Sequence, residues 1–293
     1  MKITVVIPCF NAVSSINRTL NSVKNQDYQD FECLVIDGGS TDGTLDVIHS
    51  QSDWITKIVS EKDEGQYHAL KKGFSMARGE LLCWLNADDI YFPWTFRVVN
   101  RIFTESDCIQ WISGIKAFMR DDAIQATGIA TPFPRELIQS GCFHPNSEFG
   151  SIMQESCFWT KKLYDDSGGL NCNWKMAADF DLWIRFSNHA DLFATSALLG
   201  AFNYTGKNRS HEDEGMAYSK EVDTIRSFIP LKQRKVGDWL NKKKKFSKEL
   251  FFRHPWIAIL LGEYMRKSGL SGPLLQFCIP INRYKLKNAE LII

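Results

Sequence analysis

Two adjacent carboxylates at the end of an apolar run are the residues of this sequence best placed for chemistry. Asp88 and Asp89 follow the run 81–85, which is typical of a strand buried on both faces of a parallel sheet. Ligands of open α/β sheets bind at the carboxyl ends of such strands, so the two acids are placed for chemistry. A polar turn after the strand would explain the same two acids. The residues around them therefore decide between a ligand site and a turn.

Three earlier apolar runs also end in polar or acidic loops. These loops span Pro8–Asn11, Asp37–Asp42 and Asp63–Gly65. Because the carboxyl ends of parallel strands share one edge of a sheet, we expect the three loops to converge with Asn86–Asp89. Four polar strand ends at one edge favour a ligand site over an isolated turn.

The elements expected to carry these loops alternate between strands and helices. Apolar β-branched runs indicate the strands, and apolar residues three or four positions apart indicate amphipathic helices. The expected order is strand Ile3–Ile7, helix Ser14–Asn25, strand Cys33–Ile36, a helix from Leu45, strand Ile55–Val59 and helix Gln66–Ala77. Such alternation predicts right-handed crossovers and an α/β fold with a mainly parallel, Rossmann-like sheet flanked by helices.

The pattern is less regular after Asp89. We expect helices over Trp94–Phe103 and Phe180–Asn188, and strands over Ile109–Phe118, Met153–Thr160 and Leu192–Leu199. Between them we expect an irregular segment over Ala130–Pro145 and a glycine turn at Gly168–Leu170. Domain sequence continues to about Tyr204, and Gly206–Gly215 has the composition of a polar loop. From Met216 we expect a helical, basic region.

Composition narrows the partners and the compartment. The 293 residues carry a formal net charge of +1, which gives no preference for nucleic acid. The first residues have too short an apolar core for a signal peptide, and no stretch approaches the roughly 18 apolar residues of a membrane span. The 8 cysteines form no Cys-x-x-Cys pair, and Cys9, Cys33 and Cys83 lie on expected strands. Buried free thiols fit a reducing compartment, so we expect a cytoplasmic protein.

Five sequence blocks in this order resemble the family 2 glycosyltransferases, which are nucleotide-sugar enzymes with the GT-A fold. The blocks are Val5–Asn11, Val35–Thr44, Ser60–Tyr67, Trp84–Asp89, and Gln154–Trp159 continued through Gly168–Leu170 to Ala178–Arg185. The second and third blocks look most like the branch that builds bacterial surface polysaccharides. The resemblance covers about Lys2–Tyr204. It implies a catalytic domain over residues 1–204, followed by a helical, basic extension over 205–293. The nucleotide-binding half of this domain is expected over about 1–100 and the acceptor half over about 101–204.

The resemblance assigns the donor side to the loops at the strand ends. Carried over residue by residue, the nucleotide-sugar site comprises Pro8, Phe10, Asn11, Asp37, Asp63, Asn86, Ala87 and Asp88. Carboxylates accept hydrogen bonds well from ribose hydroxyls or a pyrimidine N–H. Asp37 could instead cap a turn, and Phe10 could pack in the core rather than stack on a base.

The metal motif of the family is Asp-x-Asp, and this chain departs from it. Asn86 stands at the first position, whereas Asp88 matches the second and Asp89 is the common extra acid. The resemblance therefore implies that Asp88 and Asp89 bind Mg²⁺ or Mn²⁺, which would bridge to the diphosphate. With one carboxylate fewer, the charge of this metal site is weaker.

The same resemblance assigns the chemistry of sugar transfer. In the family a general base just before a helix takes the proton of the acceptor hydroxyl, and the matching residue here is Asp179, which could also be the N-cap of that helix. Gln154 and Glu155 are expected on the acceptor side. Asp181 and Arg185, four residues apart, are expected to form a structural ion pair. One displacement with one base inverts the anomeric carbon.

These residues favour an inverting glycosyltransferase that uses a nucleotide-diphosphate sugar, UDP-linked in our prediction, to extend a glycan or lipid-linked acceptor of the cell surface. A sugar nucleotidyltransferase has a similar sheet, but it would carry a Gly-rich phosphate loop after the first strand, and Cys9–Val13 is not one. The other alternative is a degenerate transferase retained as a noncatalytic glycan-binding or scaffold protein. Asn86 is the residue that points to it.

The C-terminal region combines positive charge with bulky apolar residues. Lys242–Lys245 is followed by Phe246, Leu250–Phe252 and Trp256–Leu261. This composition suits peripheral contact with an anionic membrane surface, where a lipid-linked acceptor would be found. It also fits a solvated basic face whose apolar side packs on the catalytic domain, which is the interpretation we favour from the sequence.

Overall fold

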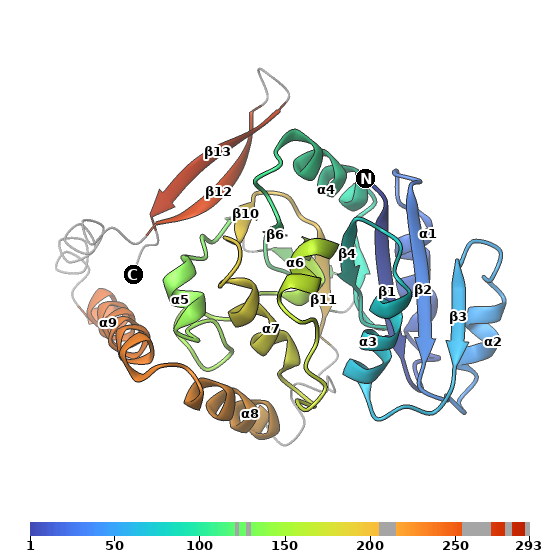
Figure 1. Cartoon of the computed structure of the whole chain (residues 1–293), viewed down its shortest axis with the longest axis horizontal. Coiled ribbons are helices and arrows are strands. Elements are labelled where there is room, and N and C mark those ends of the chain that lie inside the picture. The colour runs from blue at the N-terminus through green and yellow to red at the C-terminus, as the bar shows by residue number, and fades with distance from the viewer. Residues whose placement is uncertain (121–122, 127–129, 205–214, 254–270, 279–282, 291–293) are drawn as a thin grey trace.

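A computed structural model of the chain describes residues 1–120, 123–126, 130–204, 215–253, 271–278 and 283–290. The first part alternates strands and helices as predicted (Figure 1). In chain order its elements are β1 (Ile3–Cys9), α1 (Ile16–Lys24), β2 (Phe31–Asp37), α2 (Thr44–His49), β3 (Lys57–Ser60), α3 (Gln66–Met76), β4 (Leu81–Trp84), β5 (Ile90–Tyr91) and α4 (Thr95–Glu105).

The second part is less regular, and several elements differ from the sequence-based expectation. Its elements are β6 (Trp111–Ser113), β7 (Ala117–Arg120), β8 (Ala123–Ala126), α5 (Arg135–Gln139), the 3-10 turn η1 (Gln154–Ser156), β9 (Cys157–Thr160), α6 (Lys161–Asp166), α7 (Ala178–Phe186), β10 (Phe193–Thr195) and β11 (Gly200–Asn203). The single strand expected over Ile109–Phe118 is divided into β6 and β7. Gly114 lies at the division, where the backbone approaches Ala197 so closely that a Cβ on Gly114 would be 2.9 Å from the Ala197 carbonyl oxygen. The strand expected over Met153–Thr160 begins with η1 instead.

The strands form one large sheet and one small sheet. The large sheet has the order β13-β12-β10-β6-β9-β4-β1-β2-β3, and its β13 and β12 strands are Arg283–Glu290 and Ser271–Cys278. Parallel pairs join β1 to β2 and β4, β2 to β3, and β10 to β6 and β12. β9 runs antiparallel to β4 and β6, and β13 antiparallel to β12. The predicted α/β fold with a mainly parallel sheet is confirmed.

Two hydrophobic clusters cover the two faces of the large sheet. Successive residues of β1 point to opposite faces, so Val6 packs with α3, whereas Val5 and Ile7 pack with α1 and α4. The cluster on the α3 side is rich in tryptophan, and the Trp84 and Trp183 rings stack with centroids 5.9 Å apart. Trp84 and Trp159 are almost fully buried in this cluster, so they are core residues.

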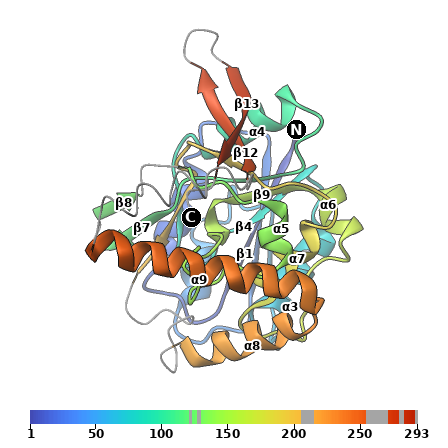
Figure 2. The ribbon, with the colours of Figure 1, turned by 90° about the vertical axis from the view of Figure 1, so that its left-hand side faces the viewer.

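The chain after Tyr204 contains both helices and strands. α8 (Met216–Ser227) and α9 (Leu231–Arg253) agree with the expected helical region, and Figure 2 shows α9 running across the face of the molecule. Residues 271–278 and 283–290 are strands where we expected helix. Pro273 is unfavourable in a helix, and 283–287 alternates polar and apolar residues with the period of a strand. Trp256–Leu261, and Gly206–Gly215 apart from Gly215, lie outside the described residues.

Two chemical expectations from composition can be compared with this structure. The cysteines in the parts that the structure describes with side chains are free thiols, and Cys9, Cys33 and Cys83 are buried as predicted. Within the described ranges, no helix combines the length and the apolar character that crossing a membrane requires.

Candidate active site

The loops after β1 and β2 are bound to each other by hydrogen bonds. Asn11 donates its backbone N–H to Ser40 Oγ at 2.8 Å, and its side-chain Oδ1 accepts from the N–H of Thr41 at 3.0 Å. Asn11 has a positive φ of 47°, a conformation that Asn tolerates better than most residues. Phe10 beside it is 63% exposed, so its ring does not pack in the core and is available to stack on a ligand. Pro8 is buried within β1.

Asp37 organises the loop after β2. Its Oδ2 accepts from the backbone N–H of Gly39 and Ser40 at 3.1 and 3.0 Å and from Ser60 Oγ at 2.7 Å, and Ser40 Oγ also bonds to Oδ1. Burial raises the pKa of Asp37, but these hydrogen bonds outweigh it and hold the pKa below the usual value. The carboxylate is fully buried in this structure, so Asp37 shapes the loop, and its contact with a ligand stays a prediction.

Asp63 reaches the same edge from the loop after β3. Its Oδ1 accepts from the N–H of Gly65 at 2.8 Å, and the side chain is half-buried. A Cβ at Gly38 would lie 3.1 Å from Asp63 Oδ2, so glycine at that position lets the second and third loops approach each other. The predicted convergence of the first three strand ends is therefore present in the structure.

Asn86 is the centre of a hydrogen-bond network at the end of β4. Its Oδ1 accepts from Gln66 Nε2 at 2.6 Å, and its Nδ2 donates to Asp89 Oδ2 at 3.1 Å and to Gln154 Oε1 at 3.2 Å. An amide both donates and accepts, so Asn86 satisfies all three partners at once. Gln154 also donates to the carbonyl of Trp84 at 2.6 Å. Gln154 is thus buried and supports this loop, and its expected place on the acceptor side stays a prediction.

The two adjacent acids occupy different environments. Asp89 is fully buried, and its Oδ1 accepts from the backbone N–H of Asn203 at 2.9 Å. Burial, followed by the charges of Asp88 and Glu155, raises the pKa of Asp89 well above its usual value. Asp89 is therefore held inside the protein behind Asp88, and its part in metal binding stays a prediction. Asp88 and Ala87 are half-buried at the rim of the site.

Glu155 is the middle residue of η1. Burial raises the pKa of Glu155 to about 8; Lys116 lowers it, and the charges of Asp179 and Asp88 raise it. Its Oε1 has no hydrogen-bond partner among the described residues, although the side chain is only 2% exposed. A Cβ at Gly200 would lie 2.2 Å from the Glu155 carbonyl oxygen, so β11 fixes the backbone of η1 closely. Glu155 is therefore a buried, protonated carboxyl at neutral pH, close to both Asp88 and Asp179.

Asp179 is in the first turn of α7. Burial raises its pKa to about 6, whereas hydrogen bonds from its own N–H, from the N–H of Phe180 and from Tyr67 lower it. Tyr67 Oη lies 3.5 Å from Asp179 Oδ1 and donates more closely to the carbonyl of Met176, at 2.9 Å. A carboxylate with this pKa is ionised at neutral pH and basic enough to accept a proton. Two residues along, Asp181 forms the predicted ion pair with Arg185 Nη2 at 2.7 Å.

Helix α8 adds two residues that the sequence did not predict for the site. Glu221 accepts from the backbone N–H of Lys175, Met176 and Ala177 at 2.8–2.9 Å, which fixes the loop before α7. Tyr218 lies near Asp179 and Glu221, and burial followed by their negative charges raises its pKa well above the usual value. Neither residue lies in a motif, and the helical spacing of apolar residues does not predict contact with a loop that lies 44–46 residues earlier than Glu221. Their role became visible only in the fold.

The site can be tested for a divalent cation by its donor chemistry. Within the described ranges, no group of three or more His, Cys, Asp or Glu side chains is arranged to hold a metal ion. Mg²⁺ commonly binds through one or two carboxylates together with substrate phosphates, so a single carboxylate at the rim is sufficient when a diphosphate supplies the other oxygens. Asp88 fits that requirement.

Comparison with known families agrees with this geometry. Residues 4–132, which include the loops at all four strand ends, match the model of glycosyl transferase family 2. The chain carries a family 2 glycosyltransferase domain. This glycosyltransferase domain is similar to an uncharacterized glycosyltransferase of Nostoc sp., with 30% identity over 159 residues that make up 50% of this chain and 49% of the relative. The chain thus spans about half the length of that relative.

Other relatives are similar over more of their length. A PGL/p-HBAD biosynthesis glycosyltransferase of Mycobacterium bovis is 29% identical over 192 residues, covering 64% of this chain and 70% of the relative. S. aureus TarS in complex with UDP-GlcNAc superposes with a TM-score of 0.61 at 16% identity, over 86% of this chain and 75% of that one. A Pyrobaculum calidifontis mannosyltransferase in complex with GDP-Man and Mn²⁺ has a TM-score of 0.52 at 17% identity, over 90% and 79%. These structural likenesses confirm the predicted GT-A fold.

Proposed function

We propose that this chain transfers a sugar from a nucleoside-diphosphate donor to a hydroxyl of a glycan or lipid-linked acceptor, with inversion at the anomeric carbon. The observation that carries the proposal is that two adjacent residues of α3 contact both sides of the site. Gln66 donates to Asn86 Oδ1 at 2.6 Å, and Tyr67 Oη lies 3.5 Å from Asp179 Oδ1, so the donor-side loop and the proposed base meet at one edge of the sheet. The family match and the UDP-GlcNAc bound in TarS support a nucleotide-sugar donor, and we propose a UDP-sugar.

The donor side is proposed to follow the loops at the strand ends. The exposed ring of Phe10 stacks on the base, while Asn11 and Asp63 line the pocket that Asp37 and Pro8 shape from below. Asn86 and Ala87 hold the loop that presents Asp88 to the diphosphate. Asp88 together with the diphosphate oxygens would hold Mg²⁺ or Mn²⁺, which when bound offsets the charge of the leaving diphosphate.

Transfer itself is proposed as a single displacement. The acceptor oxygen forms a bond to the anomeric carbon, the bond from that carbon to the diphosphate oxygen breaks, and Asp179 takes the hydroxyl proton. Its pKa of about 6 leaves Asp179 ionised at neutral pH. Glu155, protonated at that pH, adds no negative charge beside the diphosphate and can donate a hydrogen bond.

The proposed catalytic unit extends beyond the boundary expected at Tyr204. Glu221 holds the loop that leads into Asp179, so α8 belongs with the catalytic domain, whose acceptor half then contains η1, α7 and α8. We place the enzyme in cell-surface polysaccharide synthesis at the cytoplasmic side of the membrane, as the resemblance implies.

Titration calorimetry with UDP and GDP, each with Mn²⁺ and with EDTA, is the first test of the donor site. We expect metal-dependent binding of UDP, followed by turnover of UDP-sugars measured as UDP release. Binding of GDP alone would change the proposed donor, and metal-independent binding would remove the cation from Asp88. Binding of neither nucleotide would contradict the proposal and favour a noncatalytic protein.

The noncatalytic alternative rested on Asn86. The amide there makes three hydrogen bonds, to Gln66, Asp89 and Gln154. The substitution is thus consistent with an intact loop. No observation favours a sugar nucleotidyltransferase, because the loop after β1 has its single positive φ at Asn11 and is not a Gly-rich phosphate loop.

A further inference from the structure

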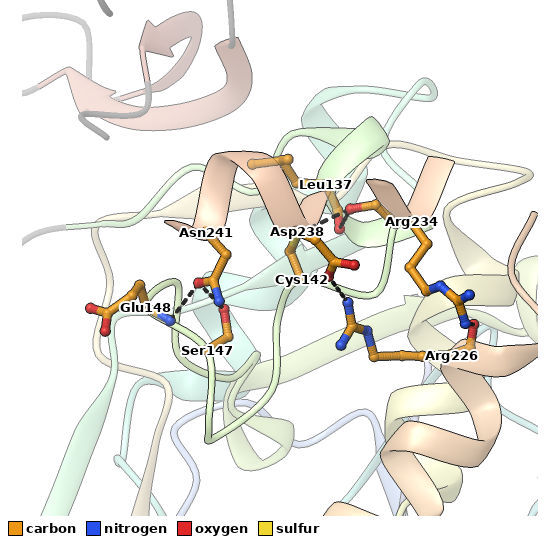
Figure 3. A network of polar contacts seen from close by, with 9 residues as sticks. Leu137, Cys142, Ser147, Glu148, Arg226, Arg234, Asp238 and Asn241 are labelled. Carbon is orange, nitrogen blue, oxygen red and sulfur yellow. Dashed lines mark hydrogen bonds and ion pairs between the residues drawn. The ribbon is translucent and has the colours of Figure 1, made fainter. Parts of the chain in front are cut away.

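Helix α9 is fixed to the catalytic domain along one side. Gly237 allows a close approach, since a Cβ there would lie 2.4 Å from Ser140 Oγ and 2.5 Å from Cys142 Sγ. Leu240 on the same side is 4% exposed. Asn241 Oδ1 accepts from Ser147 Oγ at 3.1 Å and from the N–H of Glu148 at 2.8 Å (Figure 3). Both the packing and the hydrogen bonds therefore fix which side of α9 faces the domain.

The two C-terminal helices are also joined to each other. Asp238 of α9 forms an ion pair with Arg226 of α8, and Arg234 donates to the carbonyl of Arg226 at 3.4 Å (Figure 3). Because α8 carries Glu221 to the loop before Asp179, these contacts place α9 in a defined position relative to the acceptor side.

The opposite side of α9 is exposed and combines apolar with basic residues. Six of its exposed residues fall within an arc of about 140° at 3.6 residues per turn, and the exposed Gln233 and Lys245 lie on either side of this arc. The six are Leu231, Lys232, Lys235, Val236, Trp239 and Lys242. Leu231, Val236 and Trp239 are 50–56% exposed, and Phe228 at the end of α8 is 75% exposed. We call these seven residues the α9 outer face.

Two further features distinguish the α9 outer face from the rest of the described surface. Five of the ten large hydrophobic side chains that are exposed in the described residues lie between positions 216 and 239. Between Leu231 and Lys245 the sequence has seven basic residues and one acid, and that acid, Asp238, is already paired with Arg226. Exposed tryptophan and aliphatic side chains among lysines, with no acid to repel a negative surface, match the chemistry of an anionic lipid headgroup layer.

We propose that the α9 outer face binds an anionic membrane surface peripherally. Trp239, Val236 and Leu231 enter the headgroup region, while Lys232, Lys235 and Lys242 contact acidic headgroups. The fixed position of α9 then sets one orientation of the catalytic domain relative to the bilayer. The membrane contact rests on this surface and not on the reaction, so it can fail while the proposed function stands.

Co-sedimentation of the full chain with vesicles tests this surface. Vesicles of phosphatidylcholine alone are compared with vesicles containing phosphatidylglycerol, at low and high salt. We expect binding to the anionic vesicles only, weakened by salt. The double variant Lys232→Glu/Lys235→Glu should bind at least roughly 30-fold more weakly, since each lysine near such a surface contributes about fivefold. Trp239→Ala should also reduce binding.

A control variant of equal charge separates the surface from net charge. Lys57→Glu/Lys162→Glu reverses two exposed lysines on β3 and α6, and it should bind like the unchanged protein. UDP binding by each variant shows that the variant is folded. The charge-matched variant tests membrane binding without any measurement of transfer activity. Equal binding by both double variants, or equal binding to neutral and anionic vesicles, would overturn the proposal. A dimer that Trp239→Ala dissociates would instead assign the α9 outer face to a second copy of the chain.

Discussion

Replacing Asp179 by Asn is the most direct test of the proposed base. The amide keeps the size of the side chain and can accept from the N–H of Phe180, but it cannot take a proton from the acceptor. General base catalysis contributes typically 10²–10⁴-fold, so kcat should fall by about that factor. Nucleotide affinity should be unchanged, because Asp179 lies on α7 and the nucleotide loops follow β1, β2 and β3.

The pH dependence gives a second, quantitative measure of the same group. With a pKa of about 6, Asp179 is mostly ionised at pH 7 and mostly protonated at pH 5. A protonated base cannot act, so kcat/KM should fall about tenfold from pH 7 to pH 5. This acidic limb should be absent from the residual activity of the Asp179→Asn variant.

The assay is release of nucleoside diphosphate in the presence of acceptor, with Asp181→Asn as the matched control. Asp181 lies two residues along the same helix and pairs with Arg185, so its loss should lower stability but leave the pH profile in place. Loss of a general base should leave about a hundredth of kcat or less. If Asp179→Asn keeps more than about a tenth of kcat, Asp179 does not act in proton transfer.

Three further predictions test the surroundings of this centre. Glu155→Gln should raise the free energy of unfolding by roughly 3 kcal/mol at pH 7 and by little at pH 4.5. The reason is that a carboxyl with a pKa of 4.5 in the unfolded chain and about 8 in the folded protein destabilises the fold as the pH rises from 4.5 to 8. Urea unfolding that shows an equal difference at both pH values would contradict this. Glu221→Ala removes the acceptor of three backbone N–H groups, so we expect stability to fall by about 1–3 kcal/mol and kcat to fall while nucleotide affinity is unchanged. The control Asp223→Ala, on the exposed side of the same helix, should change neither stability nor kcat. Gly38→Ala would bring a Cβ 3.1 Å from Asp63 and should weaken nucleotide binding by calorimetry without lowering the melting temperature; unchanged affinity would place Asp63 outside the pocket.

The sequence predicted the first half of the fold well because its signals there are local. β1 and β2 are apolar runs that end in turn residues, and α1 repeats its apolar residues at helical spacing. The strand ends had to meet once the strands were parallel, so Asn11 and Asp63 could be placed at one edge before the structure was known.

Partners across long distances could not be predicted in the same way. Asp37 and Asp88 are both acids after strands, yet donors from Gly39, Ser40 and Ser60 bury one of them while the other stays at the rim. Asp89 was expected beside Asp88, but Asn203, 114 positions later, supplies the N–H that holds it inside. Burial of a carboxyl depends on such tertiary donors, which a single strand pattern does not encode.

The same limit explains α8 and η1. The contacts of Glu221 span 44–46 residues, and those of Gln154 with Asn86 span 68. The motif around Gln154 and Glu155 indicated only that the segment belongs to the site. Which of the two faces the reacting groups depended on β11, which packs against η1 at Gly200.

The antiparallel strand β9 limits how this protein could be recombined with its relatives. β9 pairs with β4 on one side and β6 on the other, so it is a structural neighbour of the nucleotide-binding half although it lies more than 70 positions after β4. A chimera joined near residue 100 would set a native β4 against a foreign β9. A graft intended to exchange donors should therefore carry 154–160 together with the first hundred residues, and one intended to exchange acceptors should leave that segment in place.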